Sequence, residues 1–539
     1  MRNAMRNGTV WAAAVVLAMG AGISAQQQQA TTTPPAVLQA EQVDRYVVGQ
    51  ATPPETPGTS VMSLTLEQAI AVALDKNLDL KAARLGPSSP QGVDYQLQSA
   101  RAAFLPRYTG TYSYSNSLSP SNNVQQGVPN VSNLGQNFNA NYSQLLNFHG
   151  GNFGIAFTNG RTSTNDLSVR LNPSYTSRLN FTYTQPLLAG FKMDNTRNQL
   201  RTLGISRQIA DLTLLTQVEN TKANVRTAYW NLRAAIEQIE ISKRALDLAQ
   251  RTMNDNKVKV EIGTLAPIDT VQNQVSVAQA DQTLLAAQIA WRTAELNFKR
   301  LLAAGPEDDI YRATINPTEQ AALSISQVDI PGAIKNALAV RTDIVQTRRN
   351  LEISQLNLDV TKDTLRPQLD LSSGFNSNGQ GGTRKDNLGN LTEQSGYNGA
   401  LRNLSGFDNK GWNAQLNFTV PLGRDITINR VNYARAILSI EQAEASLKAQ
   451  ELTITADVTN AGLAVDNNYR QYLAAQKSSQ AAQTNADATL TRFNVGTSTN
   501  FEVTQAQNQL TVARLTELNR LIAYLNAIAE FDRIQRVGR

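Results

Sequence analysis

The strongest constraint on this fold is that the chain carries the same signals twice, in the same order. Four pairs of segments correspond between its two halves: 66–74 with 330–338, 179–182 with 416–419, 262–264 with 495–497, and Phe298 with Phe531. Self-similarity in one conserved order is the mark of an internal duplication. We therefore expect two tandem repeats over 64–304 and 330–535, joined by an inter-repeat linker over 305–329.

Each repeat contains a long helical stretch that carries a series of residues spaced seven positions apart. In the first repeat all members are apolar: Val218, Val225, Leu232, Ile239, Leu246, Met253 and Val260. In the second repeat two members are small: Val458, Val465, Tyr472, Ser479, Ala486 and Phe493. This spacing predicts a coiled-coil seam. The stretch 195–260 would be on the order of 100 Å long at about 1.5 Å per residue, so it needs packing partners along its length.

A second helical pattern follows a glycine turn in each repeat. After Gly263 the apolar residues recur at helical spacing: Val271, Val275, Leu284, Leu285, Ile289 and Leu296. After Gly496 they recur in the same way: Val503, Leu510, Leu518, Ile522 and Leu525. Each repeat is therefore predicted to form a long antiparallel helical hairpin.

Before each hairpin the apolar period changes from helical to two. Four segments alternate apolar and polar residues, with many Tyr, Phe and Trp on the apolar side: 104–114, 179–187, 369–375 and 412–420. Such alternation is typical of strands in a membrane-spanning barrel, although a soluble sheet is the alternative. The Asn-, Gly- and Ser-rich segments 115–141 and 376–409 are expected to be long external loops.

The start of the chain indicates export. Residues 1–25 have a basic start at Arg2 and Arg6, a short apolar run, and a small-residue cleavage site ending at Ala25, as a signal peptide does. The apolar run is shorter than the roughly 20 residues of a membrane-spanning helix. Residues 26–63, rich in Gln, Thr and Pro, predict a disordered leader. The mature protein is expected in the periplasm, in the outer membrane or outside the cell.

The composition excludes most enzyme chemistry. With no cysteine and a single histidine, His149, the chain offers no disulfide, thiol nucleophile or histidine-dependent triad. Its 49 Lys and Arg against 43 Asp and Glu give a net charge of only +6 without a basic run, so no nucleic-acid partner is expected. The acidic run Glu307, Asp308 and Asp309 is interpreted as a solvated linker. We expect no catalytic, metal or cofactor site.

Four strands cannot close a membrane barrel, so several subunits must share one. In its paired Leu-x-x-Ala openings, its prolines at 106 and 367, its Pro-Leu pairs and its Gly-Thr turns, the chain resembles the outer membrane efflux family, the TolC-like proteins. The resemblance implies a mixed α and β membrane protein and a homotrimer. Its twelve-stranded outer-membrane β-barrel, with four strands per chain, would continue into a long periplasmic α-helical coiled-coil barrel.

The resemblance also implies a function. Such proteins are the outer-membrane exit ducts of tripartite efflux or type I secretion systems, through which substrates pass passively to the exterior. The implied partners are a periplasmic adaptor (membrane fusion) protein, an inner-membrane pump or ABC exporter, and outer-membrane lipid. An exported coiled-coil structural or adhesin-like trimer is the alternative, followed by a secreted enzyme. The aromatic, alternating segments 108–114 and 412–420 favour the duct, because a fibre would continue its heptads without them.

Two local features depart from the family pattern. Pro87 and Pro90 lie within a glycine- and serine-rich stretch at 86–92 and predict a kink or a short loop, whereas the corresponding stretch 344–365 is uninterrupted. The segment 153–171 alternates around Asn159-Gly160 and predicts an additional hairpin with its turn at that dipeptide.

By resemblance, two turns form the periplasmic rim at which the adaptor docks: Ile262-Gly263-Thr264 and Val495-Gly496-Thr497. Asp269 and Glu502 each lie six residues after a turn glycine, where family members place acidic residues near the entrance. We expect these carboxylates to form a ring that selects cations and is part of the gate. The alternative for Glu502 is a helix cap, since residues 499–502 fit a capping box.

The same resemblance bears on gating. Some family members latch the rim with an arginine two residues after the second turn glycine and a tyrosine three residues before it. Here those positions hold Ser498 and Phe493, neither of which can make a charged link to Asp269. We therefore expect a closed state held mainly by helix packing and only weakly dependent on salt.

Overall fold

The structure, a computed structural model, describes residues 51–54, 60–320, 328–385 and 390–536. The expected signal peptide over 1–25 and most of the expected leader lie outside the described residues. Within the described ranges, no helix combines the length and the apolar character that a membrane span requires.

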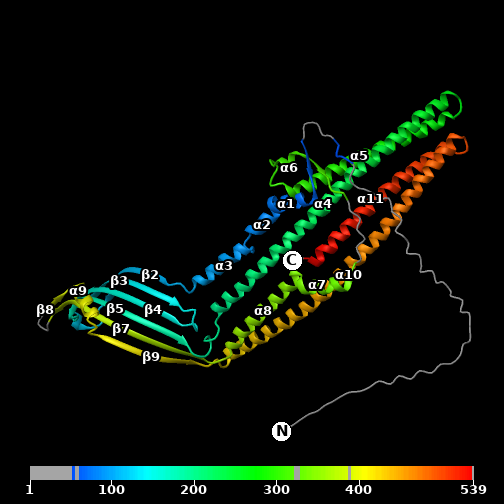
Figure 1. Ribbon diagram of the computed structural model, residues 1–539. Helices are drawn as coiled ribbons and strands as arrows, with labels where there is room; N and C mark the ends of the chain where they lie inside the picture. The colour runs from blue at the N-terminus through cyan, green and yellow to red at the C-terminus, as the bar shows by residue number, and fades with distance from the viewer. Residues whose placement is uncertain (1–50, 55–59, 321–327, 386–389, 537–539) are drawn as a thin grey trace, which may run out of the picture. The chain divides into compact units, whose positions relative to one another are not determined.

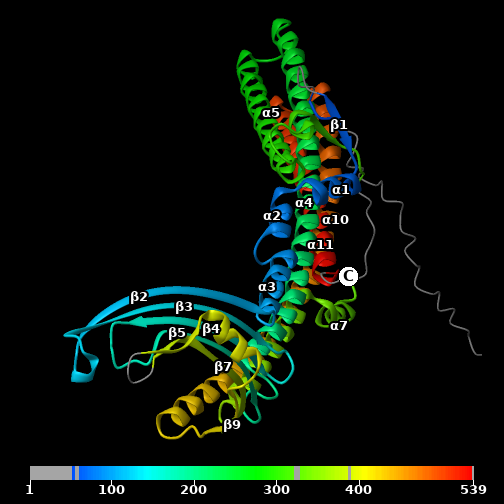
Figure 2. The same ribbon diagram turned by 90° about the vertical axis from the view of Figure 1, so that its left-hand side faces the viewer.

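Two long antiparallel helical hairpins dominate the helical part (Figures 1 and 2). The first pairs α4 (Asn195–Glu261) with α5 (Pro267–Leu302), and the second pairs α10 (Arg424–Asn494) with α11 (Asn500–Arg536). Helix α11 also packs along α4, so the two hairpins lie against each other. Both predicted hairpins are confirmed.

The predicted seven-residue seams form the core of these hairpins. On α4, Val225 and Leu232 are fully buried, whereas Val218 and Val260, the first and last members of the series, are half-buried. On α10 every member of the series is buried: Val458, Val465, Tyr472, Ser479, Ala486 and Phe493. Small residues in that series therefore pack closely instead of leaving the seam open.

The prediction for α5 is wrong in its packing face. Val275, Ile289 and Leu296, expected inside the hairpin, are 52, 69 and 50% exposed. The buried side of α5 carries Phe298 instead, whose ring packs edge-on against that of Tyr229 from α4 at 5.9 Å. The exposed residues are multiples of seven apart. They form a second seam that has no partner among the described residues, and spacing alone could not say which seam meets α4.

Shorter helices flank the long ones. Helices α1 (Leu66–Lys76) and α7 (Ile330–Val340) are followed by α2 (Leu78–Leu85) with α3 (Pro90–Ala102) in one half and by α8 (Thr342–Asp363) in the other. The predicted break at 86–92 is confirmed as a division into two helices, with α8 uninterrupted. Ser89 caps α3 by accepting the backbone N–H of Gly92 at 3.0 Å, and Pro90 occupies the first turn.

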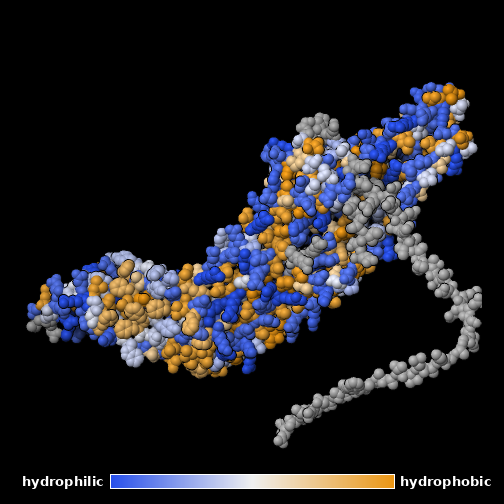
Figure 3. Space-filling model, viewed as in Figure 1, coloured by the Kyte–Doolittle hydropathy of each residue, from blue (hydrophilic) through white to orange (hydrophobic). Residues whose placement is uncertain are grey.

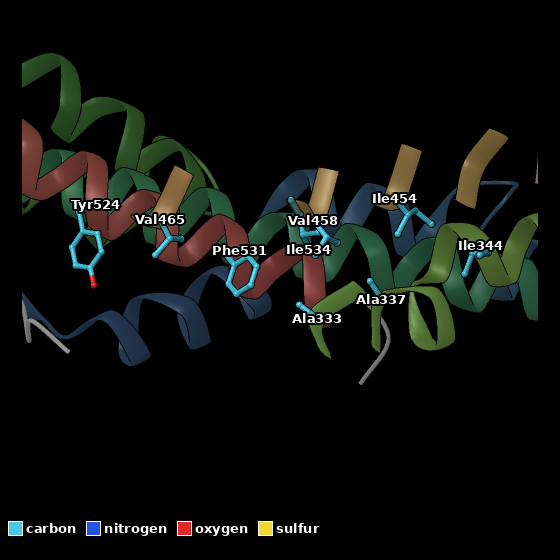
Figure 4. Packing of buried hydrophobic residues seen from close by; sticks show 9 residues of the cluster. All are labelled: Ala333, Ala337, Ile344, Ile454, Val458, Val465, Tyr524, Phe531 and Ile534. Carbon is cyan, nitrogen blue, oxygen red and sulfur yellow. The ribbon is translucent and has the colours of Figure 1, made fainter. Parts of the chain in front are cut away.

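One continuous apolar cluster joins the helices of the second half (Figure 4). It takes side chains from α7, α8, α10 and α11: Ala333, Ala337, Ile344, Ile454, Val458, Val465, Tyr524, Phe531 and Ile534. All nine are less than a tenth exposed. Burial of such side chains, at about 1.5–3 kcal/mol each for the larger ones, fixes the short helices onto the long hairpin.

Two segments expected to lie outside the repeats pair with each other. Strand β1 (Val61–Leu64) lies parallel to β6 (Thr314–Pro317). Polar side chains of α4 hold this pair: the Tyr229 hydroxyl donates to the Leu64 carbonyl at 3.1 Å, and Arg233 Nη1 donates to the Pro317 carbonyl at 2.6 Å. Ordered structure thus begins before the expected end of the leader at 63.

The expected linker over 305–329 is also structured in part. It contains α6 (Asp309–Arg312) as well as β6. The interpretation of Asp308 as a solvated residue is wrong, because its side chain is 9% exposed, caps α6 and pairs with Lys76 Nζ at 3.0 Å. An acidic residue after a helix end is a good N-cap for the next helix, and that role decides its position here.

The other strands form one sheet of seven strands: β2 (Arg107–Pro120), β3 (Asn130–Leu145), β4 (Asn152–Thr164), β5 (Leu171–Pro186), β7 (Gln368–Lys385), β8 (Leu391–Ser395) and β9 (Lys410–Thr419). The spatial order is β2-β3-β4-β5-β7, with β8 and β9 both pairing with β7. All these pairs are antiparallel.

The prediction of four strands per chain is wrong, since six of the strands have ten or more residues. The end of β2 and the first part of β3 together fill most of the expected loop at 115–141, and β7 extends into the expected loop at 376–409. The additional hairpin is real but is built differently. Asn159 and Gly160 lie inside β4, paired with β3 and β5, instead of forming a turn. One chain thus contributes six long strands in place of the expected four; the expected twelve-stranded total of the assembled barrel stays a prediction about several subunits.

The sheet has two chemically distinct faces. Residues of one face are largely aromatic and aliphatic, for example Tyr108, Phe157, Phe181, Leu371 and Trp412, and cross-strand pairs keep them on the same side. We call this the apolar face. Residues of the other, polar face are mostly Asn, Thr and Ser. Figure 3 shows hydrophobic surface gathered over part of the sheet and over its junction with the helices.

The polar face explains why sequence reasoning missed strands. In β3, Asn137, Asn139 and Asn141 alternate with Phe138, Ala140 and Tyr142. Asparagine favours turns and is depleted in strands, so its density was interpreted as a loop. Its spacing of two places it on one side of the sheet, where neighbouring amides and hydroxyls satisfy it: Asn139 Nδ2, for example, donates to Thr111 Oγ1 of β2 at 3.3 Å.

Two short elements complete the described part. A 3₁₀ turn, η1 (Val124–Gln126), connects β2 to β3. Helix α9 (Tyr397–Ser405) connects β8 to β9 and packs on β7 and β5. Sequence reasoning placed no helix there.

Candidate functional site

The candidate site is the pair of turns at the ends of the two long hairpins, far along the helices from the sheet (Figure 1). Each turn closes its first helix in the same way. Gly263 has φ of +79° and Gly496 has φ of +78°. The N–H of Thr264 reaches back to the Lys259 carbonyl at 2.9 Å, and that of Thr497 to the Arg492 carbonyl at 2.9 Å. This bond to the carbonyl five residues back, the 6→1 pattern, is the Schellman closure, which needs a left-handed residue.

The threonine hydroxyls of the two turns repeat the backbone bond. Thr264 Oγ1 donates to the Lys259 carbonyl at 2.9 Å, and Thr497 Oγ1 donates to the Arg492 carbonyl at 3.1 Å. Nothing lies within 4 Å of a Cβ built on either glycine. Hydrogen bonds therefore hold the backbone of each tip, and the space beside each turn glycine is open. Ile262 and Val495 are 68 and 70% exposed, so each tip presents one apolar side chain to a partner.

Behind the turns the two helix starts differ. Thr499 and Glu502 form the predicted capping box: Thr499 Oγ1 accepts the Glu502 N–H at 3.3 Å, and the Glu502 carboxylate accepts the Thr499 N–H at 3.0 Å. The Ser498 hydroxyl bonds to the same carboxylate. These bonds, that of Ser498 first, lower the pKa of Glu502. At the first tip, Ala266 offers no side-chain cap and Pro267 opens α5.

Asp269 lies in the first turn of α5, half-buried. Its backbone carbonyl accepts Asn500 Nδ2 at 3.4 Å. The Asn500 Oδ1 in turn accepts Asn256 Nδ2 at 2.7 Å, and both asparagines are nearly fully buried. One amide thus joins α4, α5 and α11. The structure brings Asp269 and the helix carrying Glu502 together through this bridge, not through their carboxylates.

A second set of contacts joins the hairpins beside the bridge. Lys259 Nζ lies 4.2 Å from the centre of the Phe493 ring, a cation–π contact. Further along, Gln507 Nε2 donates to Thr252 Oγ1 at 3.1 Å. We call the Asn256–Asn500–Asp269 bridge and the Lys259–Phe493 contact together the tip latch. No carboxylate takes part in it through its side chain.

Sequence reasoning missed Asn256, although a signal was present. Three residues after each seam position of α4 comes a second series: Thr221, Ala228, Ala235, Ser242, Ala249 and Asn256. Thr221, Ser242 and Asn256 are buried. A seven-residue series of small and polar residues marks a close helix contact, and a buried Asn in such a series fixes register. The apolar series alone does not reveal this contact.

A groove runs along the outside of the second hairpin near its tip. Its walls come from α10 and α11 and include Ala475, Ser478, Phe501, Gln505 and Val512. Phe501 and Val512 are 59 and 63% exposed. On α10 nearer the sheet, Leu438 and Leu452 are 62 and 73% exposed, fourteen residues apart. Both hairpins therefore carry apolar surface that no other described part of the chain covers. Among the described residues, no group of His, Asp and Glu is arranged to hold a metal ion.

Comparison with known proteins gives a consistent result. A family model described as outer membrane efflux protein matches residues 69–304 and 333–534. No curated protein sequence matches the chain. Among solved structures, the CmeC outer membrane channel of Campylobacter jejuni is similar with a TM-score of 0.63 and 18% identity, over 88% of this chain and 86% of that one.

Two further channels show the same likeness. VceC, an outer membrane protein of Vibrio cholerae, has a TM-score of 0.63 and 14% identity, over 88% of this chain and 96% of that one. The open-state MtrE outer membrane channel of Neisseria gonorrhoeae has a TM-score of 0.58 and 17% identity, over 92% and 96%. At these identities the likeness establishes the fold.

Proposed function

Because the chain belongs to the outer membrane efflux protein family, we propose that it is the passive exit duct of a tripartite efflux or type I secretion system. The family is one of outer-membrane channels and not of enzymes, so the protein is an outer-membrane efflux channel whose helices extend into the periplasm. The observation that carries the proposal is a sheet with one apolar face joined directly to two long hairpins with exposed seams.

The duct is a homotrimer, for a reason that starts at the sheet edges. Within the described residues the sheet is open, and β2 and β9 each pair on one side only. Unpaired backbone groups inside a bilayer cost several kcal/mol each, so these edges need partners. Strands β2 and β9 run in opposite directions, so β9 of one subunit can pair antiparallel with β2 of the next.

Three such sheets would close a barrel of eighteen strands, three times six. The count is even, as is usual for bacterial outer-membrane barrels. The apolar face meets lipid and the polar face lines the lumen. The exposed seams support the same assembly in the periplasm. Val275 and Ile289 on α5, with Leu438 and Leu452 on α10, would pack against neighbouring subunits and complete a tube of helices.

The helix tips are the periplasmic entrance. The exposed Ile262 and Val495 beside rigid glycine turns offer a periplasmic adaptor protein two equivalent docking points per subunit, and an inner-membrane pump or ABC exporter would deliver substrates through it. The tip latch holds the two hairpins together in the closed state, and Asp269 and Glu502 give the entrance its negative charge. The two halves of each subunit, 64–304 and 330–535, act as copies of one structural unit.

A disulfide experiment tests the trimer and the barrel together. The chain has no cysteine of its own, so introduced pairs report without background. Single cysteines scanned along β2, combined with one at Gln415 in β9, should yield covalent trimers in denaturing gels. The pair Thr184→Cys with Ser372→Cys, whose hydroxyls lie 3.3 Å apart across β5 and β7, is the control and should cross-link within one chain.

The functional half of the test is transport. In a strain that lacks its own duct and carries a matching adaptor and pump, the wild-type protein should restore efflux or secretion. Oxidised β2–β9 trimers should retain it, because the proposed barrel does not need to dissociate. Cross-linked products that are only dimers, or intrachain β2–β9 disulfides, would overturn the shared barrel. The adhesin-like alternative predicts no transport in any variant.

A further inference from the structure

Helix α9 lies on the apolar face of the sheet. Side chains alternate along a strand, so Ser377, Gly379 and Gly381 of β7 share the face of Leu371 and Phe375. A Cβ on Gly379 would lie 1.9 Å from the Ala400 carbonyl oxygen, and one on Gly381 would lie 2.5 Å from that of Gly396. The backbone of α9 and the turn before it therefore rest directly on the lipid-facing wall.

Specific hydrogen bonds hold the helix in this place. Ser377 Oγ donates to the Leu404 carbonyl at 3.0 Å and is fully buried. The Tyr397 hydroxyl donates to Asn159 Oδ1 of β4 at 2.6 Å, and Asn403 Nδ2 donates to the Gln380 carbonyl at 2.8 Å. These three bonds span β4 and β7. Helix α9 is thus a fixed part of the wall.

Beside α9 the wall is hollowed into an apolar groove. Its lining comes from β4, β5 and α9 with the residues that follow it: Phe157, Leu179, Asn398, Leu401, Arg402, Leu404, Ser405 and Phe407. Phe407 has φ of +54°, a conformation that is rare for a bulky residue and usually occurs where the surroundings require it. Its ring lines the groove and lies 6.0 Å from that of Phe375.

Positive charge lies at the same place. Arg402 lines the groove and is exposed. Lys410 begins β9 opposite Ser377, on the apolar face, and is also exposed. Asp408 lies between them in sequence, which leaves a net charge of +1. A cation beside an apolar hollow on a membrane-facing wall matches a ligand with hydrocarbon chains and an anionic head.

We infer that this groove binds an acyl chain of an anionic lipid in the outer leaflet, with the headgroup phosphate at Arg402 and Lys410. The groove opens on the surface that meets lipid, so its natural occupant comes from the bilayer. It lies over β4 and β5, in the interior of the sheet, so a neighbouring subunit that pairs with β2 or β9 does not cover it. One site per chain gives three per trimer.

Native mass spectrometry of the full-length trimer in mild detergent tests the inference. The probe is bisphosphorylated, six-chain lipid A, and phosphatidylcholine is the comparison lipid. The wild-type trimer should retain up to about three lipid A molecules at collision energies that strip phosphatidylcholine. Leu401→Asn removes apolar lining and should weaken retention about tenfold, since about 1.4 kcal/mol corresponds to a factor of ten.

Leu416→Asn is the matched control, because Leu416 is an apolar-face residue of β9 that is 63% exposed and lies outside the groove lining. It should leave lipid A retention unchanged. The double variant Arg402→Gln, Lys410→Gln changes only exposed side chains and should lower lipid A retention severalfold without affecting phosphatidylcholine. Heat-labile trimers in every variant establish correct assembly, independently of lipid binding.

Three results would overturn the inference: equal retention by Leu401→Asn and wild type, an equal loss in Leu401→Asn and Leu416→Asn, or no preference of the wild type for lipid A. The second would mean that lipid coats the wall without a site. None of them would affect the proposed duct, whose tests are cross-linking and transport.

Discussion

The two helical hairpins share a plan and differ in where they bury their second helix. Helix α11 buries most of its apolar residues, among them Val503, Leu510 and Leu518, and leaves Phe501 and Val512 exposed. Helix α5 leaves Val275, Ile289 and Leu296 exposed and packs on α4 through Phe298. Most apolar residues of the second helix are therefore buried within one chain in the second hairpin, whereas in the first hairpin several of them are not. Duplication has preserved the hairpin but assigned its interfaces asymmetrically.

The sharpest test of this asymmetry is a charge in the exposed seam. Ile289→Asp should prevent trimer assembly, because three buried, unpaired carboxylates would meet at subunit interfaces. Thr283→Asp, an exposed position of α5 outside both seams, is the control and should assemble. Heat-labile trimer bands and sedimentation measure the outcome. Normal trimers from Ile289→Asp would mean that the α5 seam faces water or another protein.

The next effect concerns the two tips, which are alike where the hairpins differ. Gly263→Val and Gly496→Val place a β-branched residue at φ near +78°, which costs roughly 1–2 kcal/mol and distorts the turn. Each variant should lose transport almost completely while trimers form normally. Gly305→Val, at a glycine with neither a positive φ nor a neighbour within 4 Å, should transport normally.

Transport assays in a strain with a matching adaptor measure this prediction. Loss in only one of the two glycine variants would show that the hairpins dock unequally. Full transport by both would remove the tips from adaptor docking.

A smaller effect is expected at the tip latch, where the hairpins meet. Asn256→Ala leaves the Asn500 amide without its buried partner, which costs about 1–3 kcal/mol. The closed channel should then open more often in planar bilayers. Asn467→Ala, on the exposed side of α10 where the side chain accepts only from Gln471, is the control and should gate normally.

The contacts of the tip latch also predict how channel opening responds to salt. The latch contains hydrogen bonds of side-chain amides, one cation–π contact and no ion pair, so its strength should change little with ionic strength. Open probability, at fixed voltage and corrected for bulk conductivity, should stay nearly constant between about 0.1 and 1 M KCl. A strong opening by salt would contradict this and would point to an ion pair between subunits.

A further, smaller effect separates the two helix starts. Glu502→Gln keeps an acceptor for the Thr499 N–H and removes the charge, so cation preference should fall while thermal stability of the trimer changes little. Asp269→Asn should reduce preference as well. Ion selectivity from reversal potentials measures both. Unchanged selectivity in Glu502→Gln would leave this carboxylate with the capping role alone, which the structure already demonstrates.

The smallest effect is a pH dependence of opposite sign at two carboxyls of α11. Hydrogen bonds lower the pKa of Glu502, so its contribution to stability is present above pH 4.5 and is lost as pH falls through the lowered pKa. Burial raises the pKa of Glu517, so its cost is absent below pH 4.5 and appears as pH rises through the raised pKa.

Melting curves of the trimer check the second case. Glu517→Gln should raise the melting temperature by a few degrees near pH 8 and have no effect near pH 4. The same gain at both pH values would mean that packing, and not ionisation, distinguishes the variant. The exposed Glu502 serves as the internal comparison, because its replacement by Gln should show no such gain at pH 8.

Periodicity along the chain was enough to predict much of this protein. The spacing of seven predicted the buried seams of α4 and α10, the glycines predicted the turns, and residues 499–502 predicted the capping box. These are local features, in which neighbours along the chain supply the bonding partners. The break between α2 and α3 could also be predicted from the sequence, because Pro90 cannot continue α2 and Ser89 caps α3.

The partner that each pattern meets depends on tertiary packing. A seven-residue series fits any helix of matching spacing, so it could not tell that α5 turns Ile289 away from α4. An alternating strand fits any neighbour of matching length, so β3 joins the sheet although its asparagines suggested a loop, and β4 continues through the Asn159-Gly160 dipeptide that suggested a turn. The tip latch and the contact of α9 with the sheet join residues far apart in the chain, Asn256 with Asn500 and Ser377 with Leu404. Such contacts depend on how whole elements pack, which local propensity does not encode.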